Sequence, residues 1–565
     1  TKNGGAIDCN ASSMGLNNTQ FIDNYAGEYG AALCREANAT GGFGGNNNFT
    51  RNHADIAGAA LAWLGVDGIN INNYNFINNT AGKSGGAIYV RADSPNCKVR
   101  NSYFDNNHVT DVKEGQGGAI DWLGNNGYIY NTTFEDSFAV NGGTLYVGNA
   151  SDNMTIINSS FIGSRAVGEG GSIVLCGDDA EIINSNFTYS IGLERGGVIA
   201  AHGADNATID SCQFKRTVGA GYVDTTNSSY GDGGSIFWEN SNNLNISNTN
   251  FSDVEAHALG ALTIVNCSDS AIYNVIFDGI FALDSGGCVA WINSTNVTID
   301  LCKFLNSGAS FNGGSIFFDN TDGLIKNSLF NGTSTPWGNG GAIYVSGNVT
   351  MDNLTMVDFR ASKDNAAAIY VHKGNSTISN SSFDGPNALW VAKGANVTIS
   401  NNNITGSNSN RNLSYLDSDY DANLNPVYYS VWNDGNLWLD GNNFTYVIFN
   451  NGTIWSPTKS YMLDNETWNV TWNESFTFWV KIRDDMNNSI ICADDVWASN
   501  DVKQDAGNLY ELKYNKYRAS NCYYQGSFHL LPNATTRLMN NDPYNGTLNV
   551  RMPLKLEVTH NEIGD

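Results

Sequence analysis

Glycine and aliphatic positions recur along most of the chain at nearly constant spacing. Residues 340–345 read Gly-Gly-Ala-Ile-Tyr-Val, and most copies of this motif follow one another after about 25 to 28 residues. The pattern fades after residue 369. A period of this size predicts a repeat architecture rather than one compact core. The other copies begin at Gly4, Gly30, Gly58, Gly85, Gly117, Gly142, Gly170, Gly196, Gly233, Leu259, Gly286, Gly313 and Ala366.

A second element lies about halfway between the copies. It is a β-branched run that ends in Phe, with Asn three residues before the Phe in most repeats. Asn tolerates a left-handed backbone and is expected at a turn. Each repeat therefore contains at least two short strands. The Phe positions are 21, 49, 76, 104, 134, 161, 187, 214, 251, 277, 304, 330, 359 and 383, and the Asn positions are 18, 46, 73, 101, 131, 158, 184, 248, 274, 327 and 380.

The residue three places after each first glycine is always aliphatic. Strand side chains alternate between faces, so this column is expected to point inward and the next one outward. Coils stacked in register form a parallel β-helix, in which the aliphatic and Phe columns fill the interior and the paired glycines permit a tight corner. The aromatic members of the outward column are Tyr89, Tyr146, Phe237, Phe317, Tyr344 and Tyr370.

The fold class predicted from these patterns is all-β, with two domains. Residues 1–456 form a parallel β-helix of about 27-residue coils, with an irregular insertion at 407–427 and a last coil or cap at 428–456. After Pro457 the alternation changes, and residues 461–565 read as an immunoglobulin-like β-sandwich.

Charge and hydropathy exclude several classes of partner. With 29 basic and 55 acidic residues, the net charge is −26. Nucleic acid and anionic lipid surfaces need a basic protein face, so neither is expected as a partner. No apolar stretch is long enough to span a membrane, and no leader precedes the first repeat. We expect a mature or excised fragment.

The density of Asn-x-Ser/Thr sequons predicts an exported, cell-surface or cell-wall-associated glycoprotein. About thirty sequons occur along the chain. Candidate glycosylation sites are Asn10, Asn38, Asn131, Asn153, Asn206, Asn245, Asn296, Asn348, Asn396, Asn443, Asn469, Asn533 and Asn545.

The ten cysteines do not read as the disulfide framework of a small domain. Cys212 and Cys302 occupy the same repeat position three copies apart, which is too far for a bond between stacked coils. They are expected to fill the core. Cys492 and Cys522 lie outside the repeats and are the disulfide candidates.

Two families share these motifs. The Gly-Gly-Ala-Ile and Phe-x-x-Asn elements, such as residues 21–24 and 76–79, resemble those of chlamydial polymorphic outer-membrane proteins. The fuller pattern, Gly-Gly-Ala-Ile-Tyr-Val with Val-Thr-Ile-x-Asn-Ser-x-Phe and a following immunoglobulin-like module, is similar to adhesin-like surface proteins of methanogenic archaea. The absence of an autotransporter barrel favours the archaeal comparison. The resemblance covers roughly residues 1–406 and implies a right-handed, pectate-lyase-like β-helix on an exported protein that contacts surfaces.

The sequence gives only weak support for a catalytic site or a metal site. A glycosidase needs two carboxylates facing one groove. Asp121 has Tyr89 and Tyr146 as column neighbours, whereas Asp105 and Glu135 do fall in successive repeats, in a column of mixed residues typical of a solvated turn. We assign no catalytic residue.

No histidine pair has zinc-site spacing, and His202 is expected to be an exposed strand-end residue. Asp232 lies among glycines and gives a weak Ca²⁺ signal, for which a solvated loop is the favoured explanation. We assign no metal and no cofactor.

The outward aromatic column is the remaining candidate binding surface. Aromatic rings stack on sugars or anchor protein interfaces, although cross-strand packing that stabilises the sheet is the favoured explanation of the column. We therefore expect a non-catalytic adhesin-like protein that binds surface glycans or surface proteins of neighbouring cells. A polysaccharide lyase or glycoside hydrolase is the first alternative. A surface-layer or filament subunit, self-associating through the ends of the β-helix, is the second.

Overall fold

The computed structural model describes residues 2–10, 15–37, 44–219, 233–361, 367–385, 387–405, 429–444, 447–450, 453–455, 461–463, 468–471, 475–484, 491–493, 510–518, 523–530 and 545–548. Every regular element in these ranges is a β-strand. The chain divides into two compact units, Thr1–Tyr344 and Val345–Asp565. None of the described residues forms a helix long and apolar enough to span a membrane.

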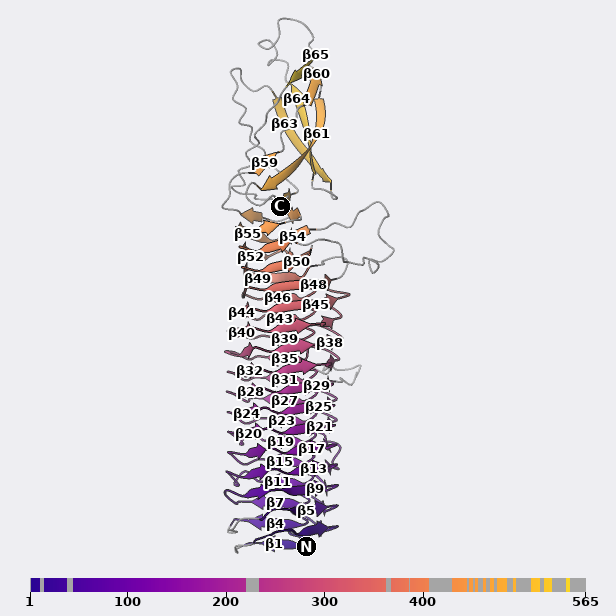
Figure 1. The fold of residues 1–565 in the computed structure, drawn as a ribbon, viewed down its shortest axis with the longest axis vertical. Helices are drawn as coiled ribbons and strands as arrows, with labels where there is room; N and C mark the ends of the chain where they lie inside the picture. The colour runs from indigo at the N-terminus through magenta and orange to yellow at the C-terminus, as the bar shows by residue number, and fades with distance from the viewer. Residues whose placement is uncertain are drawn as a thin grey trace. The chain divides into compact units, whose positions relative to one another are not determined.

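The first unit is a parallel β-helix, and the strands after the glycine motifs form its first face (Figure 1). Each strand pairs in parallel with its counterpart one repeat later, as Ile88 does with Ile120. This register brings equivalent residues of successive repeats together. The strands are β1 (Ile7–Cys9), β4 (Leu33–Glu36), β7 (Leu61–Leu64), β11 (Ile88–Val90), β15 (Ile120–Trp122), β19 (Leu145–Val147), β23 (Ile173–Leu175), β27 (Ile199–His202), β31 (Ile236–Glu239), β35 (Leu262–Val265), β39 (Val289–Ile292) and β43 (Ile316–Asp319).

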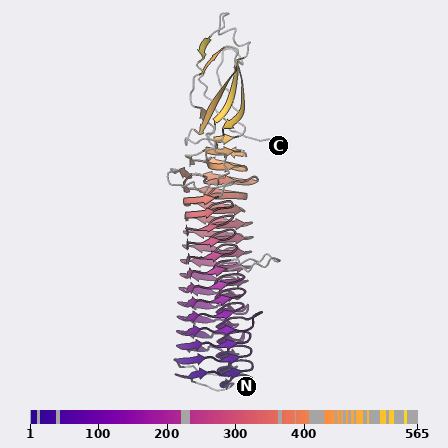
Figure 2. The same ribbon diagram turned by 90° about the vertical axis from the view of Figure 1, so that its right-hand side faces the viewer.

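Two further faces complete each coil, and Figure 2 shows the same stack from the side. The second face contains β8 (Asn70–Asn72), β12 (Lys98–Arg100), β16 (Tyr128–Tyr130), β20 (Thr155–Ile157), β24 (Glu181–Ile183), β28 (Thr208–Asp210), β32 (Asn245–Ser247), β36 (Ala271–Tyr273), β40 (Val297–Asp300) and β44 (Gly323–Lys326). The third contains β2 (Gln20–Ile22), β5 (Asn47–Thr50), β9 (Tyr74–Ile77), β13 (Tyr103–Asp105), β17 (Thr133–Glu135), β21 (Ser160–Ile162), β25 (Asn186–Thr188), β29 (Gln213–Lys215), β33 (Asn250–Ser252), β37 (Ile276–Asp278), β41 (Lys303–Leu305) and β45 (Leu329–Thr335).

The interior is built from the two predicted columns. Every member of the inward aliphatic column of the first face, from Leu33 to Ile316, is at most 1% exposed. The Phe side chains from Phe21 to Phe330 form one continuous stack with ring centroids 4.4–5.2 Å apart. Parallel, in-register coils place identical side chains one strand spacing apart, which matches the ring separation. The predicted core of the first unit is confirmed.

Glycine and asparagine form the corners as predicted. Gly117 has φ of 60°, and a Cβ on Gly118 would lie 2.0 Å from the carbonyl oxygen of Gly143. No side chain fits there. Every Asn of the predicted turn column has a positive φ, from 48° to 61°. Their side chains bond along the stack, as Asn131 Nδ2 does to Asn101 Oδ1 at 2.6 Å.

In the second unit the Phe column departs from the prediction. Met356 in β48 (Thr355–Ala361) is in register with Phe383 in β50 (Ser382–Asp384), so Phe359 is not in the stack. Phe359 is buried nonetheless. The sequence does mark Met356 as the stacked residue, because Asn353, which has a positive φ, lies three residues before it, as the turn Asn does before the stacked Phe of other repeats.

Further parallel strands of the second unit continue to residue 455. They are β47 (Val349–Asp352), β49 (Ile369–Ser379), β51 (Leu389–Val391), β52 (Ala395–Ser400), β53 (Asn403–Thr405), β54 (Tyr429–Asn433), β55 (Asn436–Asp440), β56 (Asn443–Phe444), β57 (Val447–Asn450) and β58 (Thr453–Trp455). The predicted insertion at 407–427 lies outside the described residues.

The segment predicted to be a sandwich contains several described strands. β59 (Tyr461–Leu463), β61 (Ser475–Asp484), β64 (Tyr523–Leu530) and β63 (Tyr510–Arg518) form an antiparallel sheet in that order, and β60 (Trp468–Thr471) pairs with β65 (Asn545–Leu548). β62 (Ile491–Ala493) instead pairs in parallel with β57. The immunoglobulin-like sandwich stays a prediction, as does the domain boundary near residue 460.

Candidate functional site

The outward column of the first face lies beneath the turns that carry the glycine motifs. Residues just before the glycines bridge from coil to coil, as Tyr29 does to Ala57. A Cβ on Gly58 would lie 2.8 Å from the Cβ of Tyr89. The turns therefore stand close against the outward side chains and shield them from solvent.

This cover corrects the predicted exposed aromatic surface. Phe237 is only 2% exposed and Tyr370 8%, so neither offers an open ring face. The other four predicted members, Tyr89, Tyr146, Phe317 and Tyr344, are half-buried. A sequence column shows which way a side chain points but not what folds over it.

One pair of the half-buried rings is accompanied by exposed aromatic side chains. Phe317 and Tyr344 stack with centroids 5.1 Å apart and an interplanar angle of 25°. The turns that lead into their two strands carry Phe311, 48% exposed, and Trp337, 75% exposed. The Trp337 amide donates to the carbonyl of Ser310 at 3.0 Å, so the two turns are adjacent. We call Phe311, Phe317, Trp337 and Tyr344 the aromatic face.

The second unit has an aromatic ladder of its own. Tyr370, Trp390 and Trp432 are consecutive in register, and the two Trp rings stack at 4.6 Å. Both indole nitrogens donate to the carboxylate of Asp434. Sequence analysis missed both Trp residues because the glycine motif has degenerated in these coils.

Four charged side chains gather around Phe237 on the first face. His202 Nδ1 lies 2.8 Å from Glu239 Oε1, and its Nε2 lies 2.6 Å from Glu169 Oε2. Arg195 Nη1 is 3.8 Å and 3.7 Å from the two carboxylates, and its guanidinium stands 4.8 Å from the Phe237 ring centroid. His202 is 28% exposed at the side chain and is not the open strand-end residue predicted from sequence.

The mutual contacts of this cluster shift two pKa values. Burial alone would raise the pKa of Glu169, but the hydrogen bond and charge of His202, aided by Arg195, outweigh burial and lower it. Burial would lower the pKa of His202, but bonds and charges of Glu169 and then Glu239 raise it. The contacts thus favour the charged forms of Glu169 and His202, and both ring nitrogens of His202 are bonded within the cluster.

Two other carboxylate positions remain from the search for acid chemistry. Asp121 is 2% exposed, and burial raises its pKa to about 7 against an opposing hydrogen bond from Ser84. Asp105 and Glu135 are in register on adjacent strands, as predicted, and both are half-buried. Burial, followed by the charge of Glu135, raises the pKa of Asp105. Tyr103 donates to Glu135 Oε2 at 2.7 Å.

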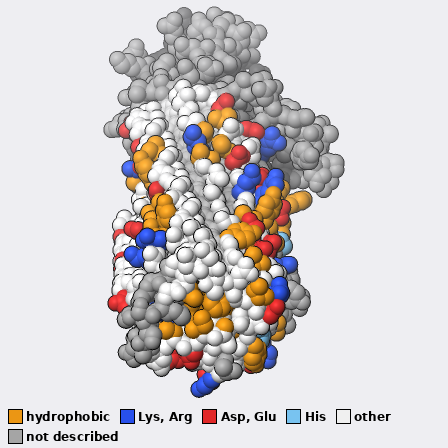
Figure 3. Space-filling view, turned by 60° about the horizontal axis from the view of Figure 1, so that its bottom comes forward, with side chains coloured by type: hydrophobic (Ala, Val, Ile, Leu, Met, Phe, Trp, Pro, Cys, Tyr) orange, Lys and Arg blue, Asp and Glu red, His pale blue; other side chains and the backbone are white. Residues whose placement is uncertain are grey.

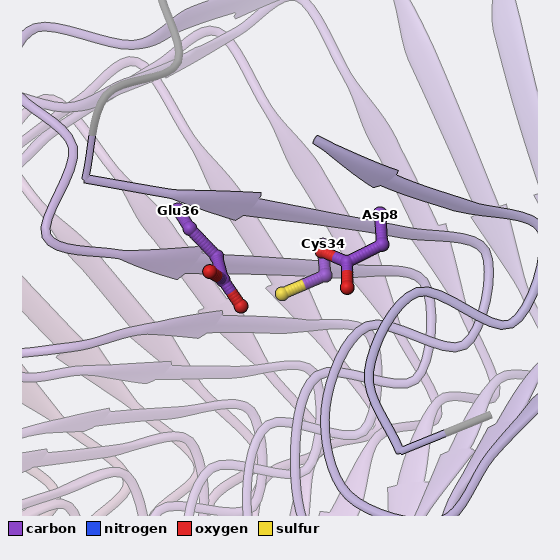
Figure 4. A group of neighbouring side chains, drawn as sticks. All are labelled: Asp8, Cys34 and Glu36. Atoms are coloured by element: carbon purple, nitrogen blue, oxygen red, sulfur yellow. The ribbon is translucent and has the colours of Figure 1, made fainter. Parts of the chain in front are cut away.

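Within the described ranges, one group of three His, Cys, Asp or Glu side chains is close enough to share a cation. It consists of Asp8, Cys34 and Glu36 (Figure 4). Sequence analysis did not identify it, although Asp8 and Cys34 are neighbours in the outward column. The predicted Ca²⁺ position, Asp232, lies outside the described residues.

The remaining predicted sites are placed as follows. Cys212 and Cys302 are buried and free. Cys522 and the side chain of Cys492 lie outside the described residues. So do Asn38 and Asn533, and the side chains of Asn469 and Asn545. Asn396 is half-buried, and the exposed sequon residues are Asn10, Asn131, Asn153, Asn206, Asn245, Asn296, Asn348 and Asn443.

Hydrophobic and charged side chains are unevenly spread over the surface. On the face shown in Figure 3 they gather in patches, with a broad white band of other side chains and backbone between them. The acidic excess of the sequence is therefore interrupted by uncharged tracts on this face.

Residues 234–404 match the family described as "Right handed beta helix region". No curated protein matches the chain. Among solved structures, it is similar to the surface adhesin PfbA of Streptococcus pneumoniae, with 12% identity, 75% of this chain and 90% of that chain covered, and a TM-score of 0.30.

A second similar structure is the A-module of the Azotobacter vinelandii mannuronan C-5 epimerase AlgE6. The identity is 11%, the match covers 71% of this chain and 91% of that chain, and the TM-score is 0.31. A third is the tailspike protein gp49 of Pseudomonas phage LKA1. The identity is 10%, the match covers 92% of this chain and 66% of that chain, and the TM-score is 0.26. The family match agrees with the parallel strand pairing, and the chain has a right-handed β-helix fold.

Proposed function

We propose that this chain is an extracellular, adhesin-like surface protein that binds glycans or surface proteins of neighbouring cells without cleaving them. The observation that carries the proposal is the aromatic face, where Trp337 is 75% exposed and Phe317 stacks on Tyr344. Trp is highly buried on average in folded proteins, and aromatic rings are favoured anchors for sugars and for protein interfaces.

The charged cluster supports a non-catalytic role. Its histidine bonds two carboxylates at once, and Arg195 lies near the same two groups. A general acid or base needs a free path to the proton it transfers. The contacts of His202 with Glu169 and Glu239 tie three coils together.

The surface chemistry fits an exported protein. Eight of the predicted sequon residues have exposed side chains, which leaves room for glycan attachment. Many weak contacts along repeated coils would combine by multivalency into useful avidity. An immunoglobulin-like module in residues 461–565 would serve as a spacer toward an anchor or a further module.

One observation favours a second candidate, a polysaccharide-cleaving enzyme. Asp105 and Glu135 are in register on adjacent strands, and the raised pKa of Asp105 suits a proton donor. Loss of oligosaccharide release in Glu135→Gln, with retained binding, would support this candidate.

Substitution of the aromatic face tests the proposal. Trp337→Ala and Tyr344→Ala should weaken retention of the full chain on immobilised polysaccharides or cell surfaces. Tyr273→Ala is the control, because Tyr273 is an exposed aromatic residue, at 43%, that lies on the second face and outside the aromatic face. Equal retention of all three variants would contradict the aromatic face as the binding surface.

A further inference from the structure

Three ligand-type side chains meet at the first two described coils. Asp8 lies in β1, and Cys34 and Glu36 lie in β4, with Asp8 directly in register with Cys34. Strand alternation places Cys34 and Glu36 on the same side of their strand. Their carboxylate oxygens and thiol sulfur all lie within 4.8 Å of one another, and Figure 4 shows the sulfur between the two carboxylates.

The thiol is the observation that separates this group from an ordinary acidic surface patch. Cys34 is 0% exposed, forms no disulfide, and has no hydrogen-bond partner among the described residues. Burial, then the charges of Asp8 and Glu36, raise the pKa of the Cys34 thiol to about 12. Burial and the charge of Glu36 also raise the pKa of Asp8. The thiol sulfur and the two carboxylates face one another within 4.8 Å, so a single bound cation could contact all three.

The surroundings orient one carboxylate. Asn3 Nδ2 donates to Glu36 Oε1 at 3.2 Å, while Asn3 Oδ1 is buried without a hydrogen-bond partner among the described residues. A polar neighbour that fixes a ligand is typical of metal sites. Arg91 is near enough to affect the Cys34 thiol, but it makes two 2.7 Å hydrogen bonds to Asp93. Its charge is therefore already engaged.

We propose that Asp8, Cys34 and Glu36 bind a Zn²⁺ ion that ties β1 to β4. One thiolate with two carboxylates suits Zn²⁺, whereas Ca²⁺ and Mg²⁺ take oxygen ligands only. Tetrahedral Zn²⁺ with bonds of about 2.0–2.3 Å holds ligand atoms about 3.3–3.7 Å apart. Because the three ligand atoms lie within 4.8 Å of one another, they would need to approach by at most about 1.5 Å on binding. The Cys34 S–H gives its proton to solvent as the Zn–S bond forms, so one proton is released per ion.

Cobalt titration of the chelator-treated full chain tests the site directly. Co²⁺ is the probe, because a thiolate ligand gives it a charge-transfer absorption band, and Zn²⁺ should remove the band by competition. We expect saturation at one Co²⁺ per chain. Cys34→Ser should abolish the band, and Asp8→Asn or Glu36→Gln should weaken Co²⁺ affinity at least about tenfold.

Cys176→Ser is the matched control, since Cys176 is a half-buried free thiol outside the group. It should retain the band. Circular dichroism of each variant verifies folding, and if Cys34→Ser does not fold, the two carboxylate variants decide the test. Absence of the band in the wild-type chain, a band retained in folded Cys34→Ser, or unchanged affinity in both carboxylate variants would overturn the proposal.

Discussion

Phe317 and Tyr344, one coil apart on the outer side of the first unit, stack with ring centroids 5.1 Å apart. Stacked rings of this kind stabilise a sheet and also present a flat apolar surface. Tyr344→Ala should lower the affinity for a glycan about 2- to 10-fold, which is the effect of losing one aromatic contact. Binding titrations on a retained polysaccharide measure this. An unchanged affinity would assign the pair to sheet packing alone.

The Phe stack should dominate the stability of the coils. Phe134 is fully buried between Phe104 and Phe161, at 4.7 and 4.8 Å. Phe134→Ala should destabilise the neighbouring coils by about 3–5 kcal/mol through lost burial and a residual cavity. Hydrogen exchange followed by mass spectrometry should show faster exchange near those strands. Phe281→Ala, at a 42% exposed ring, should have a much smaller effect.

The glycine corner gives a steric prediction. A methyl group on Gly118 would meet the carbonyl oxygen of Gly143 at 2.0 Å, so Gly118→Ala should force the backbone of two coils apart. We expect a loss of about 1–3 kcal/mol, visible as a lower thermal midpoint. Gly15→Ala is the control, because nothing lies within 4 Å of its added Cβ. Equal midpoints for the two variants would show that the corner can relax.

The cluster of His202 predicts a pH-dependent contribution to stability. Because folding raises the pKa of His202, protonated His202 stabilises the folded state, and this stabilisation is complete below the ordinary pKa of 6.5. The stabilisation is lost as pH rises through the higher pKa of the folded state. Because folding lowers the pKa of Glu169, ionised Glu169 stabilises the folded state above the ordinary pKa of 4.5. This stabilisation is lost as pH falls through the lower pKa of the folded state. The cluster should therefore stabilise the fold most between about pH 4.5 and 6.5.

Thermal scans of His202→Ala against wild type measure this effect. The difference in thermal midpoint should be largest near pH 5.5 and shrink as pH rises above 6.5 through the raised pKa of His202. His257→Ala, at an exposed histidine outside the cluster, is the control. A difference for His202→Ala that is constant across pH would contradict the ionic role of the cluster.

Much of the fold follows from sequence because each coil repeats the same local physics. The aliphatic column, the Phe stack, and the positive φ of Asn turn residues all follow from spacing. Phe359 misled the prediction because its residue type was weighed above its register. Asn353 marks Met356 as the stacked residue.

The candidate sites were harder to predict because their parts come from different columns. Glu169 and Arg195 belong to the turn before the glycine motif, whereas His202 and Glu239 end the strand after it. Only folding of the turn over the strand brings these positions together. The same turns bury Phe237, which sequence alternation placed outside.

The central claim is binding without cleavage, and one assay measures both. The full chain is applied to plant, host and microbial surface polysaccharides, and retention of protein and release of oligosaccharide are recorded together. The account predicts retention on some members of the panel, loss of retention in Trp337→Ala, and no released oligosaccharide. Catalytic release of oligosaccharide that is lost in Glu135→Gln would contradict it.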